Sequence, residues 1–146
     1  MEIQVIIANT AKEREKAYAI RRRVFIEEQN VPAELELDEY DNHKNTQHVL
    51  LFTDKEKAVG TARFRPYGDG VLKIERVAVL AEQRGGGVGR MIMEAIETEA
   101  RKAGYKCLKL SAQLHARKFY ERLGYQSYGE VYLDAGIKHI AMTKTI

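Results

Sequence analysis

The order of apolar and polar positions along the chain predicts short strands interrupted by a few helices. Four β-rich runs predict strands, at 3–7, 47–53, 58–65 and 71–79. The last three are separated by short polar or glycine-bearing connections, at 54–57 and 67–70. Such connections are typical of antiparallel hairpins, so we expect these three strands to form a meander.

Two longer segments have the spacing of amphipathic helices. Thr10 and Glu13 stand three residues apart, as in a capping box, before an apolar pattern that predicts a helix over 11–28. Apolar residues between 88 and 103 also recur at helical spacing, and Gly104 follows where a C-terminal cap belongs. We expect this second helix to pack on the sheet.

The rest of the chain completes the pattern with three more strands and one short helix. The strands are expected at 105–110, 129–133 and 139–144, and the helix at 116–123, ended by Gly124. With 146 residues the chain is long enough for one core, so we expect a single domain over 1–146. The element order predicts an α/β (α+β) protein with a mixed, mostly antiparallel sheet of about seven strands and helices on both faces.

Composition and charge exclude several classes of function. The 24 basic and 21 acidic residues give a net charge of +3, which is too balanced to indicate a nucleic-acid partner. No apolar run approaches the ~20 residues that cross a bilayer, and the start shows no signal pattern, so we expect a cytoplasmic protein without a membrane partner. Cys107 is expected as a small core residue. The four histidines lack metal-ligand spacing, so no metal is expected.

The stretch after the fourth strand reads as a phosphate cradle. Four of the five residues from 85 to 89 are glycine, at a cost on the order of a few kcal/mol in regular structure. Glycine allows close approach of the backbone to a ligand, and the following helix N-terminus offers unpaired N–H groups and partial positive charge. A flexible surface turn is the alternative, but such a turn needs fewer glycines.

The absence of two known phosphate-binding motifs narrows the range of possible ligands. The loop has no lysine followed by serine or threonine, so it is not the P-loop of ordinary ATP or GTP enzymes. The dinucleotide pattern G-x-G-x-x-G also fails, since Arg90 or Ile92 stands where the third small residue belongs. The next predicted strand ends at Ser111 rather than at an acid placed to hold a ribose. We therefore set aside an NAD-binding function.

Four segments resemble the GNAT acetyltransferase superfamily. Residues 84–89 (RGGGVG) resemble its R/Q-x-x-G-x-G/A signature, and residues 116–125 (ARKFYERLGY) resemble its A-x-x-F-Y-x-x-x-G-F/Y segment. Residues 21–32 and 134–139 are similar to small bacterial GNAT proteins of the YjcF and ElaA type. The resemblance implies the GNAT fold, with acetyl-coenzyme A (acetyl-CoA) as cosubstrate.

The implied activity is acetyl transfer to a primary amine by direct attack on the thioester. The acceptor, a small-molecule or peptide amine, is not identified by the resemblance, and the protein is expected as a monomer or homodimer. Two alternatives stay open, an acyl-CoA-binding sensor without turnover and a regulator that docks on a macromolecule.

The resemblance also implies the cofactor-binding residues. In GNAT proteins the fourth strand holds the pantetheine amides, and the glycine loop holds the pyrophosphate. The positions in this sequence are Val77, Ala78, Val79, Arg84, Gly85, Gly86, Gly87, Val88, Gly89, Arg90, Ala116, Phe119 and Tyr120.

Two residues are candidates for proton transfer. Tyr120 matches the family tyrosine near the coenzyme sulfur and is expected as general acid, with a core aromatic as the alternative. Glu75 interrupts an apolar strand on the face of Val77 and Val79, which suggests a general base, directly or through water. An ion pair with neighbouring basic residues would explain Glu75 equally well.

Four further residues are candidates for acceptor binding. They are Glu28, Gln113, His115 and His139, which the resemblance places near the cleft, although either histidine could instead satisfy a turn. The acidic run 34–41 is expected as a loop or short helix with a solvated face. Because this region borders the acceptor site in GNAT proteins, the run could instead attract a cationic amine.

Overall fold

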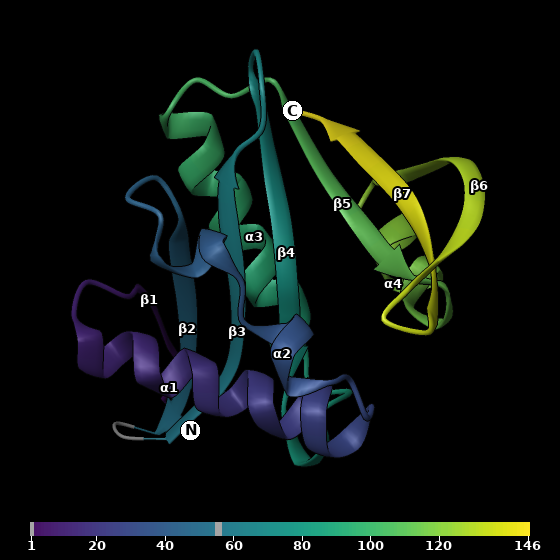
Figure 1. Ribbon diagram of the computed structural model, residues 1–146. Helices are drawn as coiled ribbons and strands as arrows, with labels where there is room; N and C mark the ends of the chain where they lie inside the picture. Colours follow the sequence, from purple (N-terminus) through teal and green to yellow (C-terminus); the bar gives the residue numbers. More distant parts are fainter. Residues whose placement is uncertain (1, 55–56) are drawn as a thin grey trace.

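A seven-stranded mixed sheet runs through the computed structural model, which describes residues 2–54 and 57–146 (Figure 1). The strand order is β1-β2-β3-β4-β5-β7-β6. The strands are β1 (Gln4–Ile7), β2 (Gln47–Asp54), β3 (Lys57–Pro66), β4 (Val71–Val79), β5 (Cys107–Gln113), β6 (Gln126–Asp134) and β7 (Ile137–Thr145).

Within the described residues, β4 and β5 are the one parallel pair of neighbours, and the other strand pairs are antiparallel. The predicted sheet, mixed but mostly antiparallel, is therefore confirmed, as is the meander of β2, β3 and β4. The connection predicted at 54–57 includes residues 55 and 56, which lie outside the described residues.

Helices cover both faces of this sheet, as predicted. They are α1 (Ala11–Arg21), its π-helical continuation η1 (Arg22–Glu28), α2 (Ala33–Glu36), α3 (Val88–Lys102) and α4 (Arg117–Arg122), with short 3₁₀ turns η2 (Glu39–Asn42), η3 (Ala81–Gln83) and η4 (Leu114–Ala116). In Figure 1, α1 and α2 lie in front of the sheet and α3 lies behind it. No helix in 2–54 or 57–146 is long and apolar enough to cross a membrane.

The first helix begins where the capping box predicts. Thr10 Oγ1 accepts a hydrogen bond from the Glu13 amide at 3.1 Å, and Glu13 Oε1 accepts one from the Thr10 amide at 3.2 Å. Its predicted extent, 11–28, is right, but the last seven residues are π-helical rather than α-helical. Such segments often occur at functional sites, and η1 lies beside the cleft described below.

The core fills the space between the sheet and the helices. Val88, Ile92 and Ile96 of α3 are buried, and α1 buries Ala17 and Ile20. Gly60 of β3 lies so close to α3 that a Cβ there would stand 2.7 Å from Ile92 Cδ1. Cys107 begins β5 and is half-buried, so it is only partly the core residue that the sequence predicts.

The acidic run 34–41 departs from its expected solvated position. Glu36 is 3% exposed and Asp41 4% exposed. Buried Arg21 of α1 donates from Nη1 to Asp41 at 2.6 Å and from Nε to Glu36 at 2.9 Å. Buried Arg63 of β3 also donates to Asp41, at 3.0 Å. The expectation of a wholly solvated face is wrong, because arginines distant in the sequence compensate these two carboxylates. We call Arg21, Glu36, Asp41 and Arg63 the buried ion cluster.

Candidate active site

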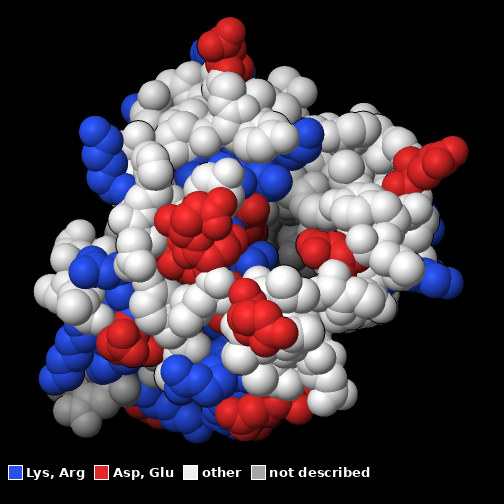
Figure 2. Space-filling view, in the orientation of Figure 1, with Lys and Arg blue, Asp and Glu red and all other residues white. Residues whose placement is uncertain are grey.

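A cleft opens where β4 and β5 separate. The two strands pair from Val71 opposite Cys107 to Ile74 opposite Leu110, and no further. Beyond that point lies a cleft of about 1200 Å³, visible in Figure 2 as a hollow with acidic and basic side chains at its rim. This is the place between neighbouring strand ends where the sequence predicts a ligand site.

A β-bulge in β4 shapes one wall of the cleft. Two residues of β4, Arg76 and Val77, stand opposite the single β3 residue between Thr61 and Arg63. Arg76 has a φ of 57°, a left-handed conformation that costs a non-glycine residue about 1–3 kcal/mol. Its side chain offsets this cost by donating to backbone carbonyls in α2, at 3.1 Å for Glu36. The bulge and the lost pairing leave backbone groups of β4 facing the cleft.

The glycine loop lies at the N-terminus of α3, at one end of the cleft. Gly85 and Gly87 both have a φ of 84°, where side chains are strained, and Gly87 is the N-cap of α3. A Cβ at Gly85 would meet no atom within 4 Å, so the loop is open to a ligand. The unpaired N–H groups of the first helical turn point out of the helix at this end. The loop therefore fits a pyrophosphate.

Gly89, in contrast, allows α4 to pack closely against α3. A Cβ at Gly89 would lie 3.1 Å from Phe119 Cζ. The Phe119 ring packs edge-on against Tyr120, with centroids 5.0 Å apart. Because Gly89 has no side chain, the Phe119–Tyr120 pair can lie close to the glycine loop.

Tyr120 lies in the wall of the cleft and is mostly buried. It is 8% exposed, and no side-chain hydrogen bond among the described residues involves its hydroxyl. Burial raises the pKa of this phenol, so it stays protonated at neutral pH. Its role as a general acid remains a prediction.

Glu28 and Arg84 form an ion pair beside the glycine loop. Arg84 donates to the two carboxylate oxygens of Glu28 at 2.5 and 2.8 Å, and to the carbonyl of Val79 at 3.1 Å. Hydrogen bonding from Arg84 lowers the pKa of Glu28. Glu28, predicted to contact the acceptor, therefore also positions an arginine between η1 and the end of β4.

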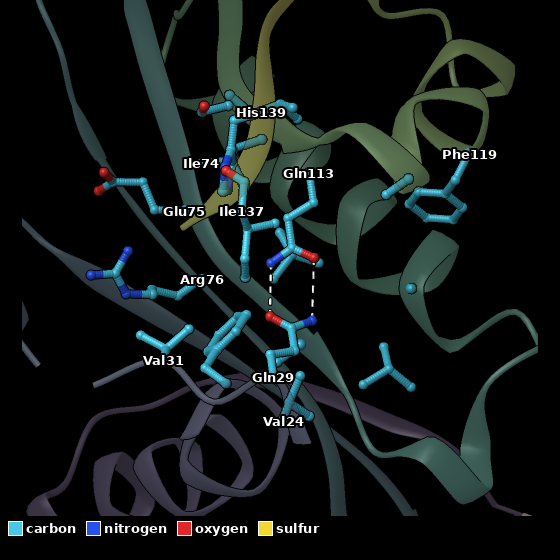
Figure 3. Close-up of a pocket in the computed structure, with 18 of the residues that line it drawn as sticks. Val24, Gln29, Val31, Ile74, Glu75, Arg76, Gln113, Phe119, Ile137 and His139 are labelled. Carbon is cyan, nitrogen blue, oxygen red and sulfur yellow. Dashed lines mark hydrogen bonds between the residues drawn. The ribbon is translucent and has the colours of Figure 1, made fainter. Parts of the chain in front are cut away.

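Two glutamines join the opposite walls of the cleft (Figure 3). Gln29, after η1, and Gln113, at the end of β5, exchange hydrogen bonds of 3.2 and 2.8 Å between their amide groups. The Gln113 carbonyl oxygen also accepts from His115 Nε2 at 2.7 Å. The predicted residues Gln113 and His115 therefore act as one hydrogen-bonded unit with Gln29, which the sequence did not single out as a site residue.

His139 lies on the β7 side of the cleft. Its Nδ1 donates to the carbonyl oxygen of Ile137 at 2.7 Å, because a carbonyl oxygen can only accept. The ring stacks on Tyr132 with centroids 6.0 Å apart, and the Tyr132 hydroxyl is hydrogen-bonded to Ser111 of β5. The His139 side chain thus bonds to the backbone within β7 and also lines the cleft, and both alternatives, acceptor binding and a structural role, stay open.

Glu75 is surrounded by basic groups. It accepts from Arg65 Nε at 2.7 Å and Arg63 Nη2 at 3.0 Å, and Lys73 Nζ lies 3.6 Å away. Burial alone would raise its pKa, but these three cations together lower the pKa to about 2. Figure 3 shows its side chain directed away from the Gln29–Gln113 pair. A carboxylate this acidic binds a proton weakly, which argues for the ion-pair alternative over a direct base.

The cleft gathers the predicted residues from distant parts of the chain. Every predicted site residue except Gly86 lines it, namely Glu28, Glu75, Val77, Ala78, Val79, Arg84, Gly85, Gly87, Val88, Gly89, Arg90, Gln113, His115, Ala116, Phe119, Tyr120 and His139. Lining residues that the sequence reasoning missed include Gln29, Tyr40, Arg65, Lys73, Arg76 and Tyr132. Arg65 and Lys73 could have been identified as site candidates from the sequence, because both are charged residues inside predicted strands. In the described ranges, no three His, Cys, Asp or Glu side chains are grouped as metal ligands.

Parallel strands that separate beside a glycine loop at a helix N-terminus are an arrangement typical of proteins that bind a phosphate-bearing ligand. Residues 8–146 match the family model of the acetyltransferase (GNAT) domain, and the chain belongs to this family of acyl-transferring enzymes. It is 41% identical over 143 residues to YjcF of Bacillus subtilis strain 168, an uncharacterized N-acetyltransferase, with 97% of this chain and 99% of YjcF covered.

Solved structures agree with this assignment. An acyl-CoA N-acyltransferase from Pseudomonas aeruginosa is 28% identical, with a TM-score of 0.88 over 98% of this chain and 99% of the other. Escherichia coli ElaA is also 28% identical, with a TM-score of 0.86 and the same coverage of each chain. The predicted resemblance to small bacterial GNAT proteins of the YjcF and ElaA type is confirmed.

Proposed function

We propose that the protein transfers the acetyl group of acetyl-CoA to a primary amine. The observation that supports this most strongly is the open glycine loop at the N-terminus of α3, next to the separation of β4 and β5. The acyl-CoA N-acyltransferase among the similar structures supports the choice of donor. The relatives are bacterial, so we place the activity in the bacterial cytoplasm, in a single domain over 1–146 that works as a monomer or homodimer.

Each part of the cleft has a task in this proposal. Acetyl-CoA supplies an activated thioester. Gly85 and Gly87 leave room for its pyrophosphate, and the backbone of Val77 to Val79 faces the pantetheine arm. A cleft-facing N–H of β4 donates to the thioester carbonyl, and one such donor typically contributes about 3 kcal/mol in the transition state.

The reaction exchanges one bond for another and moves one proton. The neutral amine attacks the carbonyl carbon, a C–N bond forms, the C–S bond breaks, and a proton of the amine is lost while the thiolate gains one. We assign the donation to sulfur to the Tyr120 hydroxyl, which lines the cleft without a hydrogen-bond partner among the described residues. Because Glu75 is a poor base, the amine proton goes to water in the cleft, and water then returns a proton to the Tyr120 phenolate.

Calorimetry and thiol detection test the proposal together. Acetyl-CoA should bind and stabilise the protein thermally, and coenzyme A should be released in the presence of some members of a panel of amino acids, amine phosphates, polyamines, aminosugars and peptides. Binding of acetyl-CoA with no thiol release across this panel would favour the alternative of a sensor without turnover. A steep salt dependence of binding to a macromolecule would favour the docking regulator.

A further inference from the structure

Three cations occupy one row across neighbouring strands, on the face of the sheet that carries Glu75. Arg65 of β3 lies opposite Lys73 of β4, and Lys73 lies opposite Lys109 of β5. Like charges directly opposite each other destabilise a sheet unless something compensates them. We call Arg65, Lys73 and Lys109 the cation row.

One aromatic ring lies over all three members of the cation row. The Tyr67 centroid is 5.8 Å from Arg65 Cζ, 4.8 Å from Lys73 Nζ and 4.9 Å from Lys109 Nζ. These distances place the three charged groups together on one side of the sheet, in the range of cation–π attraction. Tyr67 itself is 43% exposed, so solvent and ligands can reach this place.

Carboxylates neutralise the positive charge of the cation row only in part. Glu75 contacts Arg65 and Lys73, but it also pairs with Arg63 of the buried ion cluster. Lys109 has no carboxylate within 4.0 Å among residues 2–54 and 57–146. The Tyr128 hydroxyl raises the pKa of Lys109, which keeps its ammonium charged. The row therefore carries more positive than negative charge.

Two of the three members of the cation row are well placed for the acceptor, and the row is badly placed for the coenzyme's pyrophosphate. Arg65 and Lys73 line the cleft, and the row lies one pair before Ile74 and Leu110, where the strands separate. The glycine loop comes after the end of β4 at Val79. Val79 is six residues beyond Lys73, which corresponds to about 20 Å along a strand. An anion at the row would thus belong to a second ligand.

We infer that the cation row binds an anionic group of the acceptor, a carboxylate or a phosphate. The acceptor is then an amine that carries an anion, such as an amino acid or an amine phosphate. This inference rests on the proposed acetyl transfer. It reverses the expectation that the acidic run attracts a cationic amine, because Glu36, Asp38 and Asp41 are paired internally with arginines.

Matched pairs of amines test the inference with the wild-type protein. Amino acids are compared with their amides, and O-phosphoethanolamine with ethanolamine, so each pair differs in one anionic group. We expect kcat/KM to favour the anionic member by about tenfold or more. The pair with the larger ratio identifies the group as carboxylate or phosphate. Ratios near one in both kinds of pair would overturn the inference while leaving acetyl transfer intact.

Variants that remove one positive charge test whether the cation row causes the preference for anionic acceptors. Lys109→Gln and Lys73→Gln should each lower the preference about tenfold, mainly through KM for the anionic acceptor, with the Kd for acetyl-CoA within about twofold of wild type. Lys102→Gln, at the exposed end of α3, removes the same charge and should keep the preference. An unchanged preference in both Lys109→Gln and Lys73→Gln would overturn the assignment to the row.

Failure of the proposed function gives a different result. If acetyl-CoA binds and no amine is acetylated, glutarate and inorganic phosphate are titrated into the acetyl-CoA complex by calorimetry. Binding that weakens at least about fivefold in Lys109→Gln, but not in Lys102→Gln, would support the anion site and overturn the acetyl transfer. Absence of binding by both anions would overturn the anion site as well.

Discussion

Gln29 and Gln113 exchange two hydrogen bonds across the cleft, at 3.2 and 2.8 Å, and so join η1 to the end of β5. A double-mutant cycle with Gln29→Leu and Gln113→Leu should give a coupling of about 1–2 kcal/mol in the free energy of unfolding, because either single change breaks both bonds. Urea unfolding measures it. Additive effects within about 0.5 kcal/mol would show that the two amides are not coupled in solution.

The glycine loop can be tested at Gly86. Any side chain at Gly87 is strained by its φ of 84°, whereas Gly86 has no positive φ, and a Cβ there would make an ordinary contact of 3.6 Å. Gly86 does not line the cleft itself, but it lies between Gly85 and Gly87, which do, so Gly86→Asp should weaken acetyl-CoA binding at least about tenfold by adding a negative charge near the pyrophosphate. Gly86→Asn is the matched control and should bind within about threefold of wild type. Equal affinities of the two variants by calorimetry would argue against a pyrophosphate at this loop.

Tyr120→Phe removes one hydroxyl from the wall of the cleft. Because the phenol stays protonated and has no partner among the described side chains, its loss should leave the fold and acetyl-CoA binding nearly unchanged. If Tyr120 is the general acid, kcat should fall by about 10²-fold or more while the Kd for acetyl-CoA changes less than about threefold. A kcat within about twofold of wild type, with chemistry rate-limiting, would make Tyr120 a packing residue.

The buried ion cluster should dominate the stability of the acidic region. Asp41→Asn leaves Arg21 and Arg63 without this carboxylate and should lower the free energy of unfolding by about 3–5 kcal/mol. Glu39→Gln, an exposed change in the same run, should stay within about 0.5 kcal/mol of wild type. Denaturant unfolding of both variants compares them directly. Similar small effects would mean that the cluster contributes little net stability.

Glu75 should make the stability depend on acidity. Its pKa is lowered from 4.5 to about 2, so its stabilising contribution is present above pH 4.5 and is lost as the pH falls toward 2. Glu75→Gln should therefore be less stable than wild type at pH 7, and the difference should shrink between pH 4.5 and pH 2. Urea unfolding across this window checks the sign. A difference that stays constant with pH would show that Glu75 has an ordinary pKa.

The sequence determined the elements and the class of the protein. Periodicity placed all seven strands, because alternation and β-branching are local properties, although β5 (Cys107–Gln113) was predicted at 105–110 and β6 (Gln126–Asp134) at 129–133. The capping box fixed the start of α1, and the glycine loop indicated a phosphate ligand, because unusual backbone conformations demand unusual residues locally.

Only the tertiary structure decided the partners of the charged residues. Glu36 and Asp41 look like solvent-exposed acids in the sequence, yet Arg21 and Arg63, from α1 and β3, bury them. Glu75 looks like a catalytic base in the sequence, whereas the structure surrounds it with basic groups of β3 and β4, which favours the alternative of an ion pair. Lys73 and Lys109 become neighbours because β4 and β5, which α3 connects along the chain, pair in parallel. The charge state and the role of an ionisable group depend on what lies within a few ångströms, and residues distant in the sequence supply those neighbours.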